Sequence, residues 1–520
     1  MADNKKDVLI IGAGAAGSFY AARLGEAGKS VTVLDAGPEW EMRDLVSSQI
    51  FARRLRWGGM PVLPGGKHPY AFNFNAGWGA GGAALHHYGT WPRLHESDFN
   101  MQTAHGRGHD WPISYQDLQP YYDRIQKEVG VSGDAQAERW RPDGAEYPLP
   151  PLAIFEQAEV LKRGFDKLGL NTSPAPMAIL SEEYNGRAAC IYDGWCDAGC
   201  PTGALYNPLV SDVPRAKAAD VSFIFHATAT RLLMDGHRAA GIEYVDAEGK
   251  AHTAYADIVI LAASVVHIPT LLLNSVGPGY ENGAANSSGL VGKNFMSHAL
   301  APVFGLVDEP TAPYLGVNGA QLLCQDDYGK QREGGPFGSY QWLIAPAMKP
   351  NDLLGVATTR ADLFGQELDD FMRRANEHMV NMLAFVEELP REDNRIELSD
   401  QAGPLGIKLP RVVHSFTDET IQLRHSARDQ GYAVLKAAGV DAPWEGPIAQ
   451  AHMMGGMMMG TDRQNSVTNS YGQTHDIANL VIAGSSIFPT GAAVNPTFSI
   501  YALSLRSVEH MLAHWSDYAA

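Results

Sequence analysis

The stretch Asp7–Asp35, DVLIIGAGAAGSFYAARLGEAGKSVTVLD, decides the fold of this chain. Residues 8–11 and 31–34 are short apolar runs typical of buried parallel strands, and residues 18–27 between them predict a helix. Gly12, Gly14 and Gly17 form the pattern G-x-G-x-x-G. The first glycine permits a tight turn, the second lets the backbone approach a pyrophosphate, and the third lets helix and strand pack closely. The stretch therefore predicts a dinucleotide site at the helix N-terminus.

Asp35 follows the second predicted strand. A carboxylate at this position can accept hydrogen bonds from both hydroxyls of a ribose. Residues 72–99, FNFNAGWGAGGAALHHYGTWPRLHESDF, are rich in glycine and alanine. Such a run beside the βαβ unit indicates a loop that lies along a flat ligand, and a surface loop is the alternative. The predicted ligand contacts in these two stretches are Gly12, Gly14, Ala15, Ala16, Gly17, Asp35, Ala36, Gly79, Gly81, Gly82 and Ala83.

Bulk composition narrows the function class. A chain of 520 residues is too long for one core, so two or three domains are expected. The net charge of −18 argues against nucleic acid and against an anionic membrane surface as partners. No run of about twenty apolar residues predicts a membrane span. The apolar run near the N-terminus belongs to the nucleotide strand and is broken by glycines, so no signal peptide is expected.

In the middle of the chain the pattern of apolar and polar residues changes. Residues 114–130 and 155–169 predict amphipathic helices, and residues 221–261 predict a β-meander followed by a buried strand. From about residue 301 to 438, alternating stretches such as PVFGLV, GSYQWLI and RIELSD predict an antiparallel sheet, with helices at 367–377 and 417–438. This region is the candidate substrate domain.

The C-terminal part carries the most specific chemistry. It reads HMMGGMMMGTD over residues 452–462 and SVTNSYGQTHDIANLVIAGSSIFPTGAAVNPTFSIYALSLR over 466–506. His452 is a candidate general base, because neutral imidazole accepts a proton near neutral pH. Asn495 can donate to or accept from the same substrate oxygen. Residues 479–482 predict a strand, and Gly484 and Ser485 follow its end, where ligands bind in open α/β sheets.

In these motifs the chain resembles the glucose–methanol–choline (GMC) oxidoreductases from end to end. The resemblance rests on GAGAAG with Asp35, GAGGAALHHYGTWPR, VILAAS, LVGKNFMSH, and H-x-x-G-G followed by NLVIAGSSIFPTGAAVNPT. It implies FAD as cofactor and oxidation of an alcohol, with hydride moving from the carbinol carbon to flavin N5. It also implies that His452 takes the hydroxyl proton and that Asn495 is its partner.

The resemblance further implies the fold class, α/β (α+β overall): a discontinuous Rossmann-like FAD-binding domain with an antiparallel-sheet substrate domain. We expect residues 1–300 to form the FAD-binding domain, with a flavin-contacting loop at 70–100 and a cysteine loop at 186–208. Residues 301–445 are then the substrate-binding domain, and 446–520 return to the FAD domain with the catalytic pair. Further expected FAD contacts are His86, His87, Ala229, Ala263, Gly484, Ser485, Asn495, Pro496 and Thr497.

Two departures concern the flavin. VILAAS has Ser264 where the family usually has glycine, which is expected to tighten the turn without abolishing FAD binding. Some sugar oxidases of the family link a histidine of the GGAALHHYG segment covalently to FAD, and His86 is the candidate for such a link. The alternative is that His86 and His87 only pack beside the flavin.

Three of the four cysteines lie close together in the segment CIYDGWCDAGCPTGALYN. Cys190, Cys196 and Cys200 fall within eleven residues of one another. This crowding indicates a ligand set rather than a disulfide framework. The segment resembles that of the catalytic subunits of bacterial FAD-dependent glucose dehydrogenases, in which three cysteines hold a 3Fe-4S cluster. The alternatives are reduced cysteines in a packed loop, or a zinc site with a fourth ligand from elsewhere.

We therefore expect an FAD-dependent dehydrogenase of a sugar, polyol or sugar derivative, with electrons leaving through the cluster to a cytochrome c or quinone-linked acceptor. Relatives of this kind are exported folded with a small, chaperone-like, signal-bearing subunit, which implies the periplasm; the cytoplasm is the alternative. A cluster-free glycoside or pyranose oxidase that releases H2O2 is the first competing function. A flavin-bearing electron-transfer subunit, against which His452 and Asn495 argue, and a flavin-dependent lyase are the others.

Overall fold

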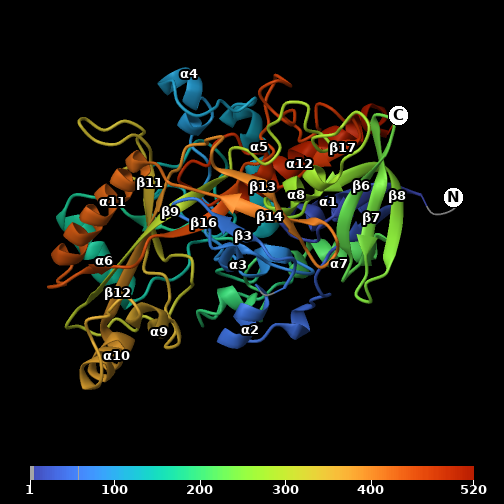
Figure 1. The fold of residues 1–520 in the computed structure, drawn as a ribbon. Coiled ribbons are helices and arrows are strands. Elements are labelled where there is room, and N and C mark those ends of the chain that lie inside the picture. Colours follow the sequence, from blue (N-terminus) through green and yellow to red (C-terminus); the bar gives the residue numbers. More distant parts are fainter. Residues whose placement is uncertain (1–4, 57, 520) are drawn as a thin grey trace.

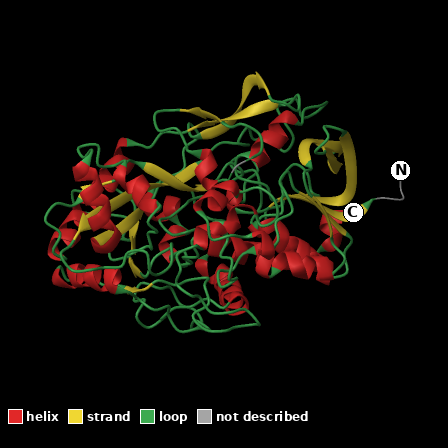
Figure 2. Ribbon diagram, turned by 90° about the horizontal axis from the view of Figure 1, so that it is seen from below, coloured by secondary structure: helices red, strands yellow, loops and turns green. Residues whose placement is uncertain are grey.

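The computed structural model describes residues 5–56 and 58–519, so the outermost residues of the first and last predicted segments lie outside it. The chain forms two lobes, each built on its own sheet (Figure 1). One lobe holds both ends of the described chain, and the other is made mainly from its middle. Figure 2 shows the helices packed around these sheets, with long loops between the lobes.

The sheet of the first lobe has the order β5-β2-β1-β8-β7-β6, with β17 also paired to β8. Strands β5, β2, β1, β8 and β17 are parallel, so their carboxyl ends meet at one edge. The bounds are β1 (Lys6–Ile11), β2 (Val31–Leu34), β5 (Ser222–Ile224), β6 (Thr228–Asp235), β7 (Arg238–Val245), β8 (Ala251–Leu261) and β17 (Leu480–Ile482).

Some helices of this lobe pack directly on the sheet, such as α1, and others pack on those helices. Helix α1 follows β1 and packs on α7 and α12, and the strand residues Val8, Leu9 and Ile10 are fully buried beneath it. The predicted βαβ unit is confirmed. The helices of this lobe are α1 (Ala15–Glu26), α5 (Tyr115–Val129), α7 (Asp212–Ala218), α8 (His267–Asn274), α12 (Thr497–Ala513) and α13 (Trp515–Ala519).

The sheet of the second lobe has the order β15-β9-β12-β11-β10-β4, with β16 also paired to β9. Its paired strands are antiparallel, as the alternating patterns predict. The bounds are β4 (Ser173–Pro174), β9 (Met296–Leu306), β10 (Leu322–Cys324), β11 (Tyr340–Ile344), β12 (Met379–Val386), β15 (Trp444–Glu445) and β16 (Ala449–Met454).

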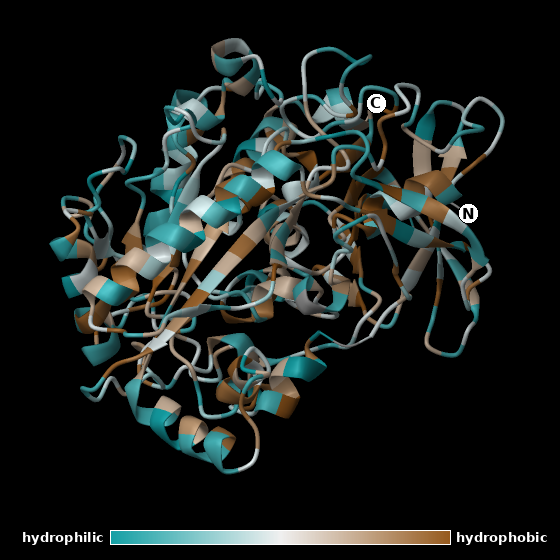
Figure 3. Cartoon of the chain, turned by 60° about the vertical axis from the view of Figure 1, so that its left-hand side comes forward, coloured by the Kyte–Doolittle hydropathy of each residue, from teal (hydrophilic) through white to brown (hydrophobic). Residues whose placement is uncertain are grey.

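The two faces of this second sheet have different neighbours. Alternate residues such as Trp342, Ala384 and Val303 pack with helices α6 (Glu156–Lys167) and α11 (Asp418–Ala437). The residues between them, such as Leu343 and Phe385, pack with the cysteine loop. Figure 3 shows the result: hydrophobic colour runs along the inner strands, and the outer helices are largely hydrophilic.

The remaining elements connect and flank the lobes. Helices α9 (Asp352–Ala357) and α10 (Gln366–His378) form an excursion between β11 and β12, visible at the bottom of Figure 1. The short helices α2 (Gln49–Arg54), α3 (Phe72–Asn75) and α4 (Met101–His105) lie in the long loops after β2. None of the helices within the described ranges combines the length and the apolar character that a bilayer crossing needs.

One strand prediction is wrong in detail. The RIELSD stretch lies in β13 (Arg395–Ala402), which leaves the second sheet and pairs with β14 (Lys408–Val413) in a separate sheet with β3 (Leu63–Gly65). Within the predicted meander, residues 222–235 form two strands: β5, parallel to β2, and β6, antiparallel to β7. Alternation predicts a strand correctly but does not specify its partner.

Candidate active site

The carboxyl edge of the first sheet gathers the predicted nucleotide contacts. Gly12 follows β1, Asp35 follows β2, Ala263 lies just beyond β8, and Gly484 lies just beyond β17. Gly14, Ala36, Ala263 and Gly484 are only half-buried although the strands before them are buried. This edge is where open α/β sheets bind their ligands.

The loop at 79–83 lies directly against the N-terminus of α1. Gly82 approaches Gly14 so closely that a Cβ on Gly82 would lie 2.9 Å from the Gly14 Cα. Gly12 has φ +106°, and a Cβ there would lie 2.6 Å from the Ala262 carbonyl oxygen. No side chain caps the first turn of α1 at Gly14. Its N–H groups can therefore meet a phosphate, so this edge fits a dinucleotide.

Asp35 links three backbone segments of this nucleotide edge by hydrogen bonds. Its Oδ2 accepts the Ala13 N–H at 2.8 Å, and its Oδ1 accepts the N–H groups of Gly37 at 2.8 Å and Gly79 at 3.0 Å. Burial raises the pKa of this carboxyl, and the three backbone N–H groups oppose that rise. Acceptor capacity for a ribose then remains mainly on Oδ2, whereas the sequence predicts that Asp35 serves both ribose hydroxyls.

We expect Asp35→Ala to weaken retention of the nucleotide. The change leaves three backbone N–H groups without their acceptor, each at a cost of about 1–3 kcal/mol, and loosens the loop at Gly79 against the sheet. The ratio of flavin to protein absorbance after dialysis should fall well below that of the parent. A variant that keeps its full flavin content would contradict this role.

His452 lies on β16 of the second sheet rather than in a loop. Between Ala451 and Met454 the strand makes three steps where its partner β9 makes two, which is a β-bulge. His452 occupies the bulge with φ +64°, a conformation that is uncommon for a residue other than glycine. Its ring stacks on Phe385 with a centroid distance of 4.9 Å. A strained backbone that re-aims one side chain is typical of functional sites.

A second histidine fixes which nitrogen of His452 carries its proton. His298 Nε2 lies 2.9 Å from the Ala492 carbonyl oxygen, which can only accept, so Nε2 carries hydrogen. In the neutral ring His298 Nδ1 is then an acceptor, and it lies 2.8 Å from His452 Nδ1. His452 Nδ1 must therefore donate, and the lone pair of His452 is on Nε2. The pair presents Nε2 as a proton acceptor.

Both rings stay neutral. Burial lowers the pKa of His298 to about 4, against the two carbonyls that favour its charged form. Burial, and then the positive charge that His298 and His87 would carry, lowers the pKa of His452 well below its usual value. A protonated neighbour would remove the acceptor that His452 Nδ1 needs, so neutrality of both rings maintains the arrangement.

This neutrality predicts an unusual pH dependence. A base with an ordinary histidine pKa of about 6.5 would lose roughly tenfold of its active form at pH 5.5. Because the pKa of His452 is lowered, its base form persists as the pH falls. The rate constant of anaerobic flavin reduction by saturating alcohol should change by less than about twofold from pH 7.5 to 5.5. A tenfold fall centred near pH 6.5 would contradict the assignment.

Asn495 precedes α12 and is held by a chain of amides. Its Oδ1 accepts from Gln341 Nε2 at 3.0 Å, and Gln341 Oε1 accepts from Gln325 Nε2 at 2.8 Å. Gln325 Oε1 in turn lies 3.0 Å from His95 Nε2. Because Oδ1 of Asn495 is used as an acceptor, its Nδ2 group remains as a donor toward an oxygen in the site.

Each of the two predicted catalytic residues contacts a side chain on one face of the second sheet. Gln341, which holds Asn495, is the direct cross-strand partner of Phe385, which stacks on His452. The loop 491–492 adds a second link, since it accepts from His298 three residues before Asn495. His452 and Asn495 are thus linked through Phe385 and Gln341, and their joint action on one alcohol stays a prediction.

The two histidines of the GGAALHHYG segment differ. His86 is buried and bonds to the Ala76 carbonyl through Nε2 at 2.6 Å. His87 is half-buried, bonds to the Tyr206 carbonyl at 2.7 Å, and is close enough to His452 to influence its pKa. Of the two, His87 is the one whose charge would lower the pKa of His452. The covalent link to His86 stays a prediction.

The other predicted contacts lie near the same edge. The N–H of Ala227 donates to the Asp35 carbonyl oxygen and that of His226 to Gly37, so these residues border the predicted ribose site, and the FAD contact of Ala229 stays a prediction. Ala229 lies two residues farther along, within β6. Ala83 is exposed, Ser485 and Thr497 are half-buried, and Pro496 caps α12.

The cysteine loop packs on the same sheet face as the catalytic pair. Cys196 and Cys200 are buried in a cluster with Leu300, Leu343 and Phe385. The sulfur of Cys190 accepts the Tyr192 N–H and that of Cys200 accepts the Leu205 N–H, each at 3.3 Å. Tyr192 and Cys200 both have positive φ, +59° and +55°. Backbone N–H groups directed at sulfur suit a thiolate ligand.

The three cysteines supply the type of donor atom that iron–sulfur clusters use. Burial raises the pKa of Cys190 to about 12 and that of Cys196 well above its usual value, so these two metal-free thiols are protonated. Metal binding would release those protons. Among the described residues, however, no group of three or more His, Cys, Asp or Glu side chains is arranged to hold a metal ion. The same holds for the zinc alternative.

Sequence reasoning missed His298, Gln341 and Phe385 as site residues. A signal exists for His298, which stands in the apolar run MSHALAPVFGL where a buried polar ring needs partners. Gln341 is likewise polar within the buried strand YQWLI. Phe385 carries no signal, because a phenylalanine in a strand is ordinarily core.

Comparisons with known proteins show which family the chain is similar to. The family profile described as GMC oxidoreductase matches residues 6–300 with its N-terminal part and 390–504 with its C-terminal part. The 2-methyl-1,2-propanediol dehydrogenase of Mycolicibacterium austroafricanum is 31% identical, over 99% of this chain and 96% of its own. The fructose dehydrogenase large subunit of Gluconobacter japonicus is 28% identical, over 97% of each chain. A formate oxidase variant of Aspergillus oryzae RIB40 has a similar fold, with a TM-score of 0.71, 17% identity and full coverage of both chains.

Proposed function

The chain belongs to the GMC oxidoreductase family, whose members bind FAD and oxidise CH–OH groups, and we propose that it is a dehydrogenase of a sugar or sugar-derived alcohol. The observation that carries this proposal is the His298–His452 pair, which presents a neutral nitrogen as base. His452 lies on β16, where Ser485, just beyond β17, donates to the Met453 carbonyl. Relatives that are dehydrogenases of a diol and of fructose support the substrate class.

In this proposal His452 Nε2 takes the hydroxyl proton of the alcohol. His452 Nδ1–H stays bonded to His298, so the proton that arrives on Nε2 leaves an imidazolium beside a neutral acceptor. Asn495 Nδ2 donates to the substrate oxygen, where charge gathers as the proton leaves. Phe385 holds the His452 ring flat against it and excludes water from that side. Bound FAD supplies the hydride acceptor, which no side chain can provide.

We assign Cys190, Cys196 and Cys200 as ligands of a 3Fe-4S cluster in the same proposal. The N–H groups directed at two of the sulfurs support it. The name of the fructose dehydrogenase large subunit supports a multi-subunit enzyme, and we include a small signal-bearing subunit, export to the periplasm and a cytochrome c or quinone-linked acceptor in the proposal. The dehydrogenase assignment and the external acceptor depend on each other. A cluster would pass the electrons of the flavin to an acceptor other than O2.

The test of the function is a screen of aldoses, glycosides, polyols, sugar acids and small diols, read anaerobically as bleaching of the flavin absorbance. At least one compound should reduce the flavin completely, with a product carbonyl formed in equal amount. If none does, the chain is not an alcohol dehydrogenase, and a flavin-bearing electron-transfer subunit replaces the proposal.

One observation favours a second function, a cluster-free oxidase. The cysteine side chains among the described residues are not arranged as a metal-holding group. In that case the reduced protein should consume O2 and release one H2O2 per alcohol oxidised. Peroxide at stoichiometric yield from iron-free, active protein would replace the dehydrogenase by the oxidase.

A further inference from the structure

The outer side of the cysteine loop forms one wall of a cavity of about 430 Å³. Trp195, the residue before Cys196, lines it, and so does Tyr192, whose N–H donates to the Cys190 sulfur. The rest of the lining comes from Tyr314, Leu315 and Pro350, with the polar residues Asp193, Lys349 and Asn376. Three aromatic side chains around one space suit a flat, unsaturated ring.

The lysine of this cavity is paired with carboxylates before any ligand enters. Lys349 Nζ lies 4.8 Å from the centroid of the Trp195 ring and donates to the Gly194 carbonyl at 2.8 Å. It also pairs with Asp197 at 3.3 Å and Asp352 at 3.1 Å. The ammonium therefore fixes the indole by a cation–π contact and is already neutralised by two carboxylates. A neutral ligand is favoured over an anion.

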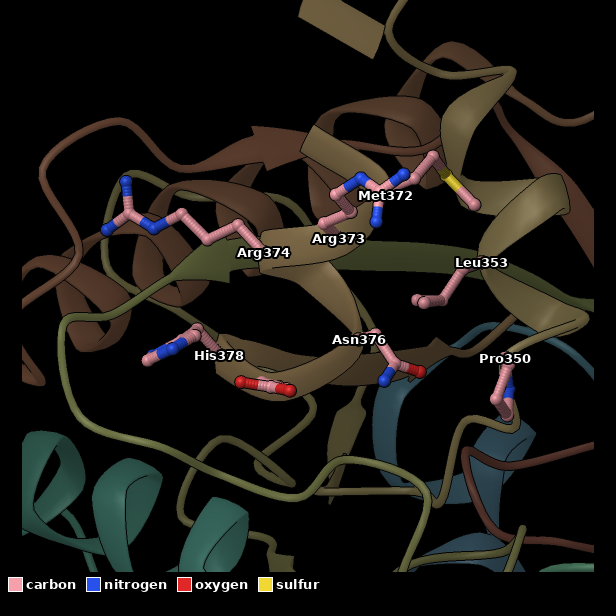
Figure 4. A pocket seen from close by; sticks show the side chains of 8 residues that line it. Pro350, Leu353, Met372, Arg373, Arg374, Asn376 and His378 are labelled. Atoms are coloured by element: carbon pink, nitrogen blue, oxygen red, sulfur yellow. The ribbon is translucent and has the colours of Figure 1, made fainter. Parts of the chain in front are cut away.

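Polar groups for a ligand remain at the rim. Within the described part of the chain, the side-chain amide of Asn376 makes no hydrogen bond, so its N–H groups can donate to a ligand carbonyl. Pro350 and Asn376 also border a second cavity of about 690 Å³, lined further by Leu353 and Met372. Figure 4 shows Pro350 and Asn376 toward the end of that cavity away from Arg374. A substituent on the ring has room there.

We propose that the cavity over Trp195 binds a small neutral electron acceptor of the quinone class, the acceptor of the dehydrogenase proposed above, on which this inference rests. Oxidation of one CH–OH group to C=O releases two electrons and two protons, counting the proton taken by His452. One quinone takes up two electrons and two protons to become the hydroquinone, so the exchange balances. The quinone carbonyl accepts from Asn376, and its ring stacks within Tyr192, Trp195 and Tyr314.

The test uses FAD-loaded protein and 2,3-dimethoxy-5-methyl-1,4-benzoquinone. The variant Tyr314→Ala/Asn376→Leu removes one aromatic wall and the amide donor, and neither residue lies in the catalytic pair or among the cysteines. Phe364→Ala is the matched control, because Phe364 is an aromatic residue outside the cavity with 80% of its surface exposed. Equilibrium dialysis gives the Kd of the quinone for the oxidised protein, and steady-state assays give its KM.

We expect the double variant to raise the Kd and the KM for the quinone at least about tenfold, which corresponds to roughly 1.4 kcal/mol. The rate of anaerobic flavin reduction by alcohol and all constants of Phe364→Ala should stay unchanged. A Kd within twofold of the parent in the double variant overturns the proposal. If no alcohol reduces the flavin, the proposed function fails, and the dialysis result still decides whether the cavity binds a quinone.

Discussion

His452→Ala is expected to slow flavin reduction by alcohol by about 10²–10⁴-fold, because this is the usual contribution of a positioned general base. The protein should stay yellow, since His452 lies on β16 of the second sheet and not at the nucleotide edge. Anaerobic stopped-flow absorbance gives the rate constant at saturating alcohol. His425→Ala, an exposed histidine on α11, is the matched control and should leave the rate unchanged.

The backbone of His452 requires a second variant. Alanine at φ +64° is strained, so a slow variant could reflect a rearranged bulge. Asparagine tolerates this conformation better and cannot act as a base. His452→Asn should therefore be as slow as His452→Ala while its thermal midpoint stays closer to that of the parent. If His452→Asn reduces flavin at the parental rate, His452 is not the base.

The second large effect concerns the cysteines. Replacing Cys190 and Cys200 together by alanine should abolish bound iron and slow electron delivery to external acceptors about 10–100-fold, because ligand loss empties a metal site. Flavin reduction by alcohol should remain within about twofold of the parent, since neither sulfur touches the catalytic pair. Iron and sulfide analysis with EPR, and turnover with and without acceptor, are the measurements.

The control for this pair is Cys324→Ala. Cys324 is buried in β10 on the other face of the sheet, in the cluster with α6 and α11, so it reports the effect of losing any buried thiol. It should keep its iron and its turnover. If the parental protein contains no iron and still turns over at full rate with an external acceptor, the cluster assignment is wrong.

The sequence predicts the first lobe well because its decisive contacts are local. The glycines, the helix and the second strand of the βαβ unit lie within thirty residues, and each is demanded by its own backbone geometry. The alternating stretches of the middle region likewise predict strands, because alternation reflects one buried face. Their partners are set by contacts across the whole chain, and RIELSD was therefore assigned to the wrong sheet.

The catalytic arrangement was predictable only in part. His452 and Asn495 follow from the family resemblance, but His298 is 154 residues from His452 and Gln341 is 154 residues from Asn495. No local pattern links such positions. Asp35 shows the same limit: its bonds to Ala13 and Gly79 join three loops, and only the folded chain reveals that the carboxylate serves the nucleotide edge as well as the ligand.

The most direct test of the central claim is an anaerobic reduction followed by reoxidation in one experiment. FAD-loaded protein is mixed with the best alcohol from the screen until its flavin is bleached, and is then exposed either to air-saturated buffer or to 2,3-dimethoxy-5-methyl-1,4-benzoquinone. The account predicts full bleaching, with reoxidation much faster by the quinone than by O2. A flavin that no alcohol bleaches, or one that O2 reoxidises faster with stoichiometric H2O2, would contradict it.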